Sequence, residues 1–393
     1  MKVMAIFSSL SRDSARALGS VKEFLPFSYS EKLKSLLLGK KATVSFSEVS
    51  TSFGFGFSFP VFHSITEEGS VNAFIEVANR MILEKSFERW FRKFSANALG
   101  NITQLIAGLC SNVSGQVPDF ILNALALAIF SQEPFHMLII SDRDSPLDSL
   151  LAELDSLLFG FSAFYAEEAS EKDAFRQALS QSDESALLIH SLRELKDTDV
   201  ELLFDAMEYS LIPESSHIEA SGDSGKQKKP ARRKKCTVSV IARLVPSLPA
   251  RFINSKEQLL EQIPKPELMA GAFHFPIILN QKPKPEELIA PGSKKSREPA
   301  KSPDFIFARE YIDYCRARSP YFPESLEEAL SALFLKLKEK EPESLFPINE
   351  KILAGMIRLS KSFARLELKN EVRQKHIDFV FSLFDQVLFG NPK

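Results

Sequence analysis

Glycine is the residue that this sequence lacks most clearly. The 393-residue chain contains 15 Gly and 34 Phe, whereas average usage of about 7% would give roughly 27 Gly. Few glycines leave few positions where backbone N–H groups can approach a phosphate closely. Neither Gly-x-Gly-x-x-Gly nor Gly-x-x-x-x-Gly-Lys-Ser/Thr occurs, which excludes the usual glycine-rich phosphate loops. The composition favours helices and large side chains instead.

Cysteine, long apolar runs and net charge are also scarce. Three distant cysteines without a Cys-x-x-Cys pair exclude a four-cysteine zinc site and are typical of a reducing compartment (Cys110, Cys236 and Cys315). No segment approaches ~20 uninterrupted apolar residues, and Met1–Leu10 lacks a signal-peptide core. We therefore expect no membrane association and an intracellular protein, cytoplasmic or nucleoid-associated in a prokaryote and nuclear in a eukaryote. Because 49 Lys and Arg balance 51 Asp and Glu, any nucleic-acid affinity must come from a local patch.

Residues 1–97 predict a small mixed module. Ser30–Leu38 is rich in leucine and predicts a helix, and residues 42–50 alternate apolar and polar side chains as a half-buried strand does. Phe53–Phe59 has Phe at every second position, which places four rings on one face of a strand. That face is consistent with a sheet packed on a core and also with a platform for stacking single-stranded bases.

Residues 98–281 predict an α/β core, because short apolar strands alternate with helices. The expected strands are 135–140, 186–189, 237–244 and 275–279, and the expected helices are 121–130, 147–158 and 197–209. Residues 282–303 are rich in Pro, Lys and Ser and predict a linker. Residues 304–393 predict a helical subdomain, with helices at 305–318, 326–340, 350–366 and 371–388.

A cluster of cations ends a second linker-like stretch at residues 221–235. Residues 226–235 hold seven cations and no acid: Lys226, Lys228, Lys229, Arg232, Arg233, Lys234 and Lys235. Such a patch can bind nucleic-acid phosphates with a steep salt dependence. A solvated loop and, in a cell with a nucleus, an import signal are the alternative interpretations.

Three blocks of the sequence carry a family resemblance. They are residues 105–130, which begin Leu-Ile-Ala-Gly-Leu-Cys-Ser-Asn, residues 196–208, which read Lys-Asp-Thr-Asp-Val-Glu-Leu-Leu-Phe-Asp-Ala-Met-Glu, and residues 348–368, which contain Met-Ile-Arg-Leu-Ser. They are similar to the entry helices, the helix after the Walker B strand and the sensor 2 helix of the minichromosome maintenance (MCM) replicative helicases, an AAA+ family. The resemblance covers roughly Asn101–Leu388. It implies an AAA+ α/β core with a helical lid, preceded by a truncated N-terminal module without a zinc ribbon.

The phosphate loop of this family is degenerate here. Where the family has Gly-Asp-Pro-Gly-Thr-Ala-Lys-Ser, the aligned residues 141–148 read Ser-Asp-Arg-Asp-Ser-Pro-Leu-Asp. Leu147 replaces the phosphate-binding Lys and Asp148 the magnesium-binding Ser, while Asp144 replaces a Gly. At ~4 Å and an effective dielectric near 20, each carboxylate–phosphate pair costs about 4 kcal/mol, against about 8 kcal/mol for micromolar binding. We therefore expect no nucleotide binding in the manner of the family.

The other positions of the ATPase site agree with this expectation. The Walker B Asp-Glu aligns with His190 and Ser191, and the sensor 1 Asn aligns with Arg243. The arginine finger aligns with Ala272 and the sensor 2 Arg with Lys351, which keeps the positive charge. Because the arginine finger serves a neighbouring subunit, its loss favours a free-standing or remodelled role over substitution into a working ring.

The sequence thus predicts a non-hydrolysing MCM-like protein that binds DNA or replication partners, other MCM proteins among them. No cofactor or metal is expected, and the six histidines show no metal-ligand spacing. The basic run falls where the family carries its presensor 1 hairpin, which contacts DNA. The alternatives are a divergent ATP-dependent DNA helicase that binds ATP and magnesium through rearranged residues, and a decaying paralogue without a role.

Overall fold

The structure is a computed structural model of the chain. It describes residues 44–50, 58–64, 91–109, 117–143, 151, 161–165, 174–183, 186–213, 233–279, 308, 311–312 and 314–390. The chain forms two compact units. One comprises Met1–Asn101 and Glu298–Asp313, and the other comprises Ile102–Arg297 and Tyr314–Lys393. The second unit therefore contains both the α/β region and most of the helical region that follows it.

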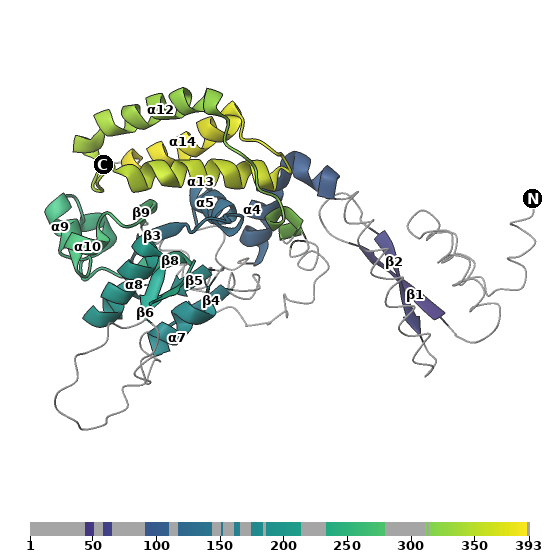
Figure 1. Cartoon of the computed structure of the whole chain (residues 1–393), viewed down its shortest axis with the longest axis horizontal. Helices are drawn as coiled ribbons and strands as arrows, with labels where there is room; N and C mark the ends of the chain where they lie inside the picture. The colour runs from purple at the N-terminus through teal and green to yellow at the C-terminus, as the bar shows by residue number, and fades with distance from the viewer. Residues whose placement is uncertain are drawn as a thin grey trace, which may run out of the picture. The chain divides into compact units, whose positions relative to one another are not determined.

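The second unit is built on a five-stranded parallel sheet (Figure 1). Its strands lie in the order β4 (Phe161–Phe164), β5 (Ala186–Ile189), β8 (Ser239–Leu244), β3 (His136–Ser141) and β9 (Phe275–Leu279). All four neighbouring pairs are parallel. Every residue of β3 is buried, as expected for a strand of a parallel sheet with both faces covered. The predicted α/β class is confirmed.

The short apolar runs of the sequence account for most of this sheet. The strands predicted at 186–189 and 275–279 have the same bounds in the structure, and β3 and β8 begin one and two residues later than predicted. The sequence does not predict β4, because a four-residue Phe-Ser-Ala-Phe segment is too short for a pattern to stand out. Of the helix predicted at 147–158 the structure describes Leu151 alone, which is helical and buried.

Helices cover the sheet on both sides. Helices α7 (Ala174–Gln181) and α8 (Asp197–Tyr209) connect β4 to β5 and β5 to β8, so both connections move across the sheet in the same direction. Because such crossovers are right-handed, the two helices lie on the same face of the sheet, where they contact each other. Helix α5 (Asp119–Ile129) leads into β3 and follows α4 (Ala98–Leu109). In α8 the acidic residues of the first turn, Asp197 and Asp199, suit the positive end of the helix dipole.

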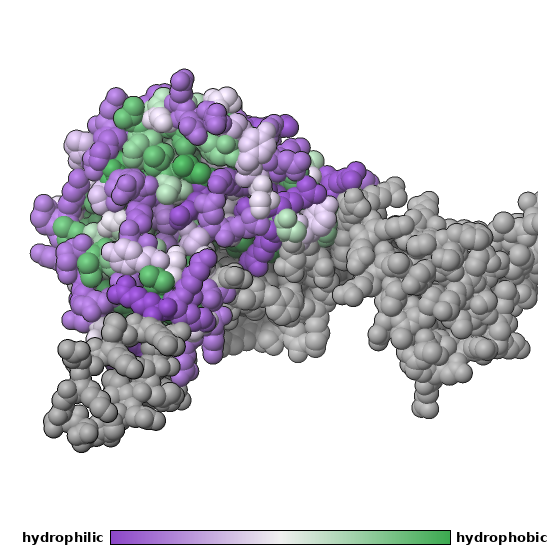
Figure 2. All heavy atoms as spheres, viewed as in Figure 1, coloured by the Kyte–Doolittle hydropathy of each residue, from purple (hydrophilic) through white to green (hydrophobic). Residues whose placement is uncertain are grey.

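Three described helices after residue 314 form a lid beside α5 (Figure 1). They are α12 (Glu327–Glu339), α13 (Glu350–Leu366) and α14 (Gln374–Phe389). Helix α13 begins at Asn349, whose side chain accepts hydrogen bonds from the first backbone N–H groups. Helix α13 packs on α14 and α5, and α14 reaches β9. Helix α12 buries only Leu330 and Leu337, and Figure 2 shows apolar surface over this part of the lid.

Polar side chains of α13 join the lid to the loop that connects α5 with β3. Arg365 donates hydrogen bonds to the backbone oxygens of Phe130 and Arg318 and to the side chain of Gln132. Arg358 and Lys361 form ion pairs with Glu133, at 3.5 Å and 2.7 Å between nitrogen and oxygen. The lid is therefore fixed to the α/β region by charged groups as well as by apolar packing.

The first unit contains an antiparallel pair of strands. Strand β1 (Val44–Ser50) pairs with β2 (Ser58–Ser64), and β1 confirms the strand predicted at 42–50. The rings of Phe91 and Phe94 each pack edge to face against the ring of Tyr311, with 5.2 Å and 4.6 Å between ring centroids. Residues 53–57 of the predicted phenylalanine strand lie outside the described residues, as do the helix predicted at 30–38 and the linker predicted at 282–303.

No helix among the described residues is both long and apolar enough to cross a bilayer. Helix α13, for example, has 17 residues, and charged residues recur along it. In the described part of the chain, the helices are built to cover the sheet and each other.

Candidate functional site

The carboxyl ends of β3 and β8 form the crevice where an open parallel sheet usually binds its ligand. The connection from β3 leads towards β4, and the connection from β8 crosses to β9 on the other side, so the chain reverses direction between these two strands. Ser141 ends β3 and is fully buried, and Asp142 and Arg143 follow it. The loop predicted to correspond to the phosphate loop therefore begins at the carboxyl end of the sheet.

A guanidinium group lies in this crevice. Arg243, which is 3% exposed, projects from β8 and donates from Nε to Ser141 Oγ at 2.8 Å. Its Nη2 donates to the backbone oxygens of Asp142 and Arg143, at 2.7 Å and 3.1 Å. Asp142 is held a second time, because its side chain accepts a hydrogen bond from the backbone N–H of Ala250 at 2.7 Å. The two backbone carbonyl groups at the start of this loop thus point towards the guanidinium group of Arg243.

Two aromatic rings close the carboxyl ends of β4 and β5. His190 follows β5 and stacks on Tyr165, with ring centroids 4.0 Å apart and planes 15° from parallel. His190 is 9% exposed, and its backbone N–H donates to Phe164 at 3.2 Å. Ser191 comes next and begins a single 3-10 turn. Magnesium prefers carboxylate and other oxygen ligands, and neither His190 nor Ser191 supplies a carboxylate.

The remaining predicted positions of the ATPase site do not gather at the crevice between β3 and β8 in the described part of the chain. Ala272 is 4% exposed and lies in the apolar interior just before β9. Lys351 lies in the first turn of α13, where its Nζ is 2.6 Å from Glu208 Oε2. Leu147 and Asp148 lie outside the described residues. The structure therefore brings Arg243 to the loop after β3 but places Lys351 elsewhere.

Lys351 lies at the amino end of the sheet, away from that loop. Its partner Glu208 follows Met207, whose backbone oxygen contacts Nε2 of His136, the first residue of β3. Asp142 comes after the last residue of β3. At 3.3 Å per residue this strand separates the two ends by about 20 Å. The ammonium group of Lys351 therefore stabilises the junction of the lid with α8.

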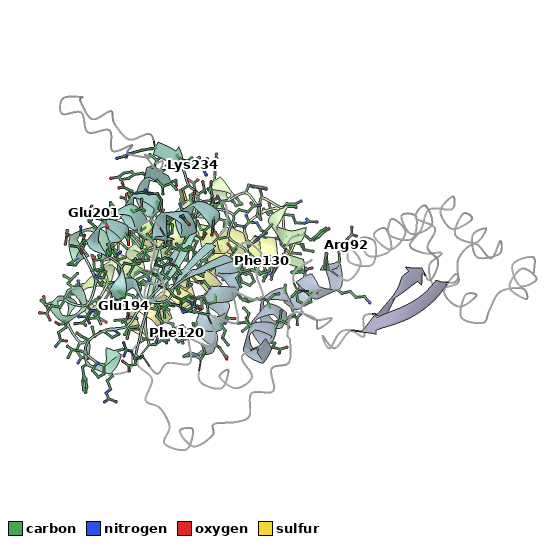
Figure 3. All side chains as sticks on the ribbon, turned by 90° about the horizontal axis from the view of Figure 1, so that it is seen from below. Arg92, Phe120, Phe130, Glu194, Glu201 and Lys234 are labelled. Carbon is green, nitrogen blue, oxygen red and sulfur yellow. The ribbon has the colours of Figure 1, made fainter. Side chains whose placement is uncertain are left out.

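The end of the basic run forms a strand, which corrects the prediction of a linker up to residue 235. Strand β7 (Arg233–Lys235) pairs antiparallel with β6 (Leu211–Pro213), which directly follows α8. All three side chains of β7 are exposed. Figure 3 shows Lys234 on the opposite side of the α/β region from Glu194, which follows the carboxyl end of β5. The cations at Lys226, Lys228, Lys229 and Arg232 lie outside the described residues.

Other chemistry finds little support among these residues. In the described part of the chain no group of three or more His, Cys, Asp or Glu side chains gathers where it could hold a metal ion. Burial and the nearby Asp183 carboxylate raise the pKa of Cys236 to about 11, so this thiol stays protonated at neutral pH and is a poor nucleophile. Neither a metal centre nor a cysteine nucleophile is built from these side chains.

The sequence analysis does not identify two aromatic residues that the structure places at notable positions. Tyr165 follows β4, a strand that the sequence does not predict, and stacks on His190. Tyr209 is 57% exposed at the end of α8, and its position matters only because the next strand, β6, pairs with the basic strand β7. An exposed tyrosine at a helix end carries no signal of its own in the sequence.

Comparison with known proteins points to one family. Residues 307–388 match the MCM AAA-lid domain, which covers the lid helices α12, α13 and α14. The chain is also 30% identical over 105 residues to the DNA replication licensing factor MCM5 of Arabidopsis thaliana. That match covers 24% of this chain and 14% of the length of the plant protein.

Proposed function

Because the chain belongs to the MCM family, we propose that it is a replication protein that binds DNA through the basic run ending in β7 and does not hydrolyse ATP. From the family relation we infer that the protein acts in DNA replication and that its partners are DNA and other MCM proteins. The observation that carries the non-hydrolysing part of the proposal is the position of Arg243 in the crevice between β3 and β8.

The loop after β3 is arranged for a cation. A phosphate site at this place needs backbone N–H groups that converge on the anion. Here the carbonyl groups of Asp142 and Arg143 converge on the guanidinium of Arg243, and the Asp142 carboxylate is held by Ala250. To bind a nucleotide here, the loop would have to break those hydrogen bonds and rotate its peptide groups so that N–H groups, in place of carbonyl groups, face the phosphates.

The missing carboxylates support the same proposal. Hydrolysis requires an acid to hold magnesium and polarise the attacking water, and the end of β5 instead presents the stacked pair of His190 and Tyr165. Ala272 offers no charge to a neighbouring subunit, and Lys351 is paired with Glu208 at the other end of the sheet. If the site bound ATP in the manner of the family, four of its functional groups would have to be replaced from elsewhere.

A nucleotide titration tests this part. Purified full-length protein is titrated with a fluorescent ATP analogue and magnesium, and we expect no saturable binding in the micromolar range. The matched variant is Arg243→Gln, which removes the cation from the crevice while the acids of the loop remain. Saturable micromolar binding by the unmodified protein, together with phosphate release, would establish the divergent ATPase instead.

The DNA-binding part depends on the exposed cations. Seven cations in ten residues predict a slope of about −5 in log K against log salt for a single strand, at about −0.7 per phosphate contact. Replacing Arg233, Lys234 and Lys235 by Gln should therefore lower the slope by about 2 units and weaken binding at least tenfold at moderate salt. Unchanged affinity in this triple variant would show that the basic run is only a solvated segment.

A further inference from the structure

Tyr209 lies beside the basic strand although the two are 24 or more residues apart in sequence. It is the last residue of α8 and is 57% exposed. The chain turns at Ser210, which has the left-handed φ of 51°, and enters β6 at once. The backbone oxygen of Ser210 accepts a hydrogen bond from Cys236 at 2.9 Å, and Leu211 pairs with Lys235. The end of β7 is thus tied directly to the residue that follows Tyr209.

The ring of Tyr209 is supported from within its own helix. Phe204 contacts it edge to face, with 6.2 Å between centroids and 90° between planes. This contact restricts the ring while more than half of the residue stays in solvent. A supported, exposed aromatic ring is what base stacking requires, because every nucleobase offers a flat face to it.

The charges around Tyr209 favour a polyanion. Glu208 is paired with Lys351 at 2.6 Å, and Glu201 is paired with Lys265, so these acids of α8 are compensated. Two partly buried acids add negative charge: Asp205, one turn before Tyr209, and Asp183, which accepts a hydrogen bond from the backbone N–H of Thr237 at 2.7 Å. Against these two charges stand the three exposed cations of β7. The net charge of the described residues around the strand is therefore positive.

We propose that Tyr209 stacks on a base of single-stranded DNA whose backbone phosphates lie on Arg233, Lys234 and Lys235. This inference rests on the proposed DNA binding and adds the form of DNA that is bound. Cations alone attract single strands and duplexes alike, whereas an exposed ring can stack only on bases that are not already paired within a helix. Tyr209 is therefore the residue that gives this surface its preference for single strands.

The test measures the affinity of the full-length protein for two fluorescent probes, an oligo-dT strand and a hairpin duplex with the same number of phosphates. We expect Tyr209→Ala to weaken oligo-dT binding about 5- to 100-fold, as loss of one stacked base does, and to leave duplex binding and the salt slope unchanged. Tyr209→Phe should keep wild-type affinity for oligo-dT because it keeps the ring.

The matched control is Tyr321→Ala. Tyr321 is equally exposed, at 58%, but lies in the lid segment, where it hydrogen-bonds Glu371, so its loss should change neither affinity. Thermal unfolding of each variant establishes that the fold is kept. An equal loss on strand and duplex, or no loss on either, in Tyr209→Ala overturns the role of Tyr209.

The two proposals fail in different ways. If the Gln variant of Arg233, Lys234 and Lys235 loses affinity for both probes while Tyr209→Ala behaves as wild type, DNA binding stands and the stacking role falls. If wild type binds neither probe, the proposed DNA binding falls, and the stacking inference falls with it. If wild type binds both probes and the Gln variant binds them equally well, binding through β7 falls, and so does stacking beside this strand.

Discussion

Lys351 Nζ lies 2.6 Å from Glu208 Oε2, and this ion pair joins the first turn of the lid helix α13 to the last turn of α8. Lys351 is the residue that the sequence predicts to correspond to the sensor 2 arginine of the MCM helicases. In this chain its charge is used at the amino end of the sheet, beside His136, where the lid meets the α/β region.

Glu208→Gln and Lys351→Met should each destabilise the protein slightly, and the double variant should show that the two residues interact. Their side chains are 30% and 23% exposed, so water weakens the attraction and a coupling free energy of about 0.5–1 kcal/mol is expected. Urea unfolding of the four proteins in the double-mutant cycle measures it. Lys351→Arg serves as the control that keeps the charge, and zero coupling would show that the ion pair contributes nothing.

Gly355→Ala should destabilise the protein although alanine favours a helix. A Cβ at Gly355 in α13 would lie 2.7 Å from the backbone oxygen of His274 and 3.1 Å from Phe384. The gain in helix propensity is about 1 kcal/mol, and forcing the lid away from a backbone carbonyl group costs about 1–3 kcal/mol. Thermal unfolding decides the sign. Gly271→Ala, whose Cβ would meet only the side chain of Asn349 at 3.0 Å, is the milder comparison.

Arg365→Met should cost about 2–4 kcal/mol of unfolding free energy. Arg365 is 3% exposed and donates to the carbonyl groups of Phe130 and Arg318 and to Gln132. Removing it leaves buried acceptors without their donor, which is more costly than the loss of an exposed hydrogen bond. Arg365→Lys should recover only part of the loss because an ammonium group lacks the fork that reaches three acceptors. Equal stability of Arg365→Met and wild type in urea would contradict this role.

Acid should destabilise the fold at a pH where most proteins are still stable. His136 and His274 are stacked, with 4.7 Å between centroids, and are buried. Burial and then Arg358 lower the pKa of His136 to about 3, and burial, His136 and Arg358 lower the pKa of His274. Below pH ~6.5 the unfolded chain binds protons that the folded protein does not, so stability falls by about 1.4 kcal/mol per pH unit for each histidine.

The contribution of the two histidines is complete above about pH 6.5 and is lost progressively below it. Urea midpoints between pH 5 and 7 measure this slope, and His136→Gln should reduce it by about one proton. Glu133 affects stability at lower pH. Burial would raise its pKa, but Lys361 and Arg358 outweigh burial and lower the pKa from 4.5. The contribution of this carboxylate to the free energy of unfolding is therefore lost only below about pH 4.5. A flat stability profile from pH 7 to 5 would contradict the prediction.

The sequence alone determined the elements with a clear local pattern. Four consecutive apolar residues at 186–189 specify a buried strand, and the helix predicted at 350–366 has the same bounds as α13. It also determined the family relation, and it predicts which residues replace the phosphate loop, since both are read position by position. Strands β4, β6 and β7 escaped prediction because they have three or four residues each and, in β7, only cations.

Only the tertiary structure decided what those residues contact. It inserted β8 between β5 and β3, which carried Arg243 to Ser141 across 102 positions of sequence, and it directed Arg365 to Phe130 across 235. It also paired Lys351 with Glu208 and set Tyr209 beside the basic strand. The physical reason is that hydrophobic periodicity and capping act over a few residues, whereas these contacts depend on strand order and on how a helix packs, which no local pattern encodes.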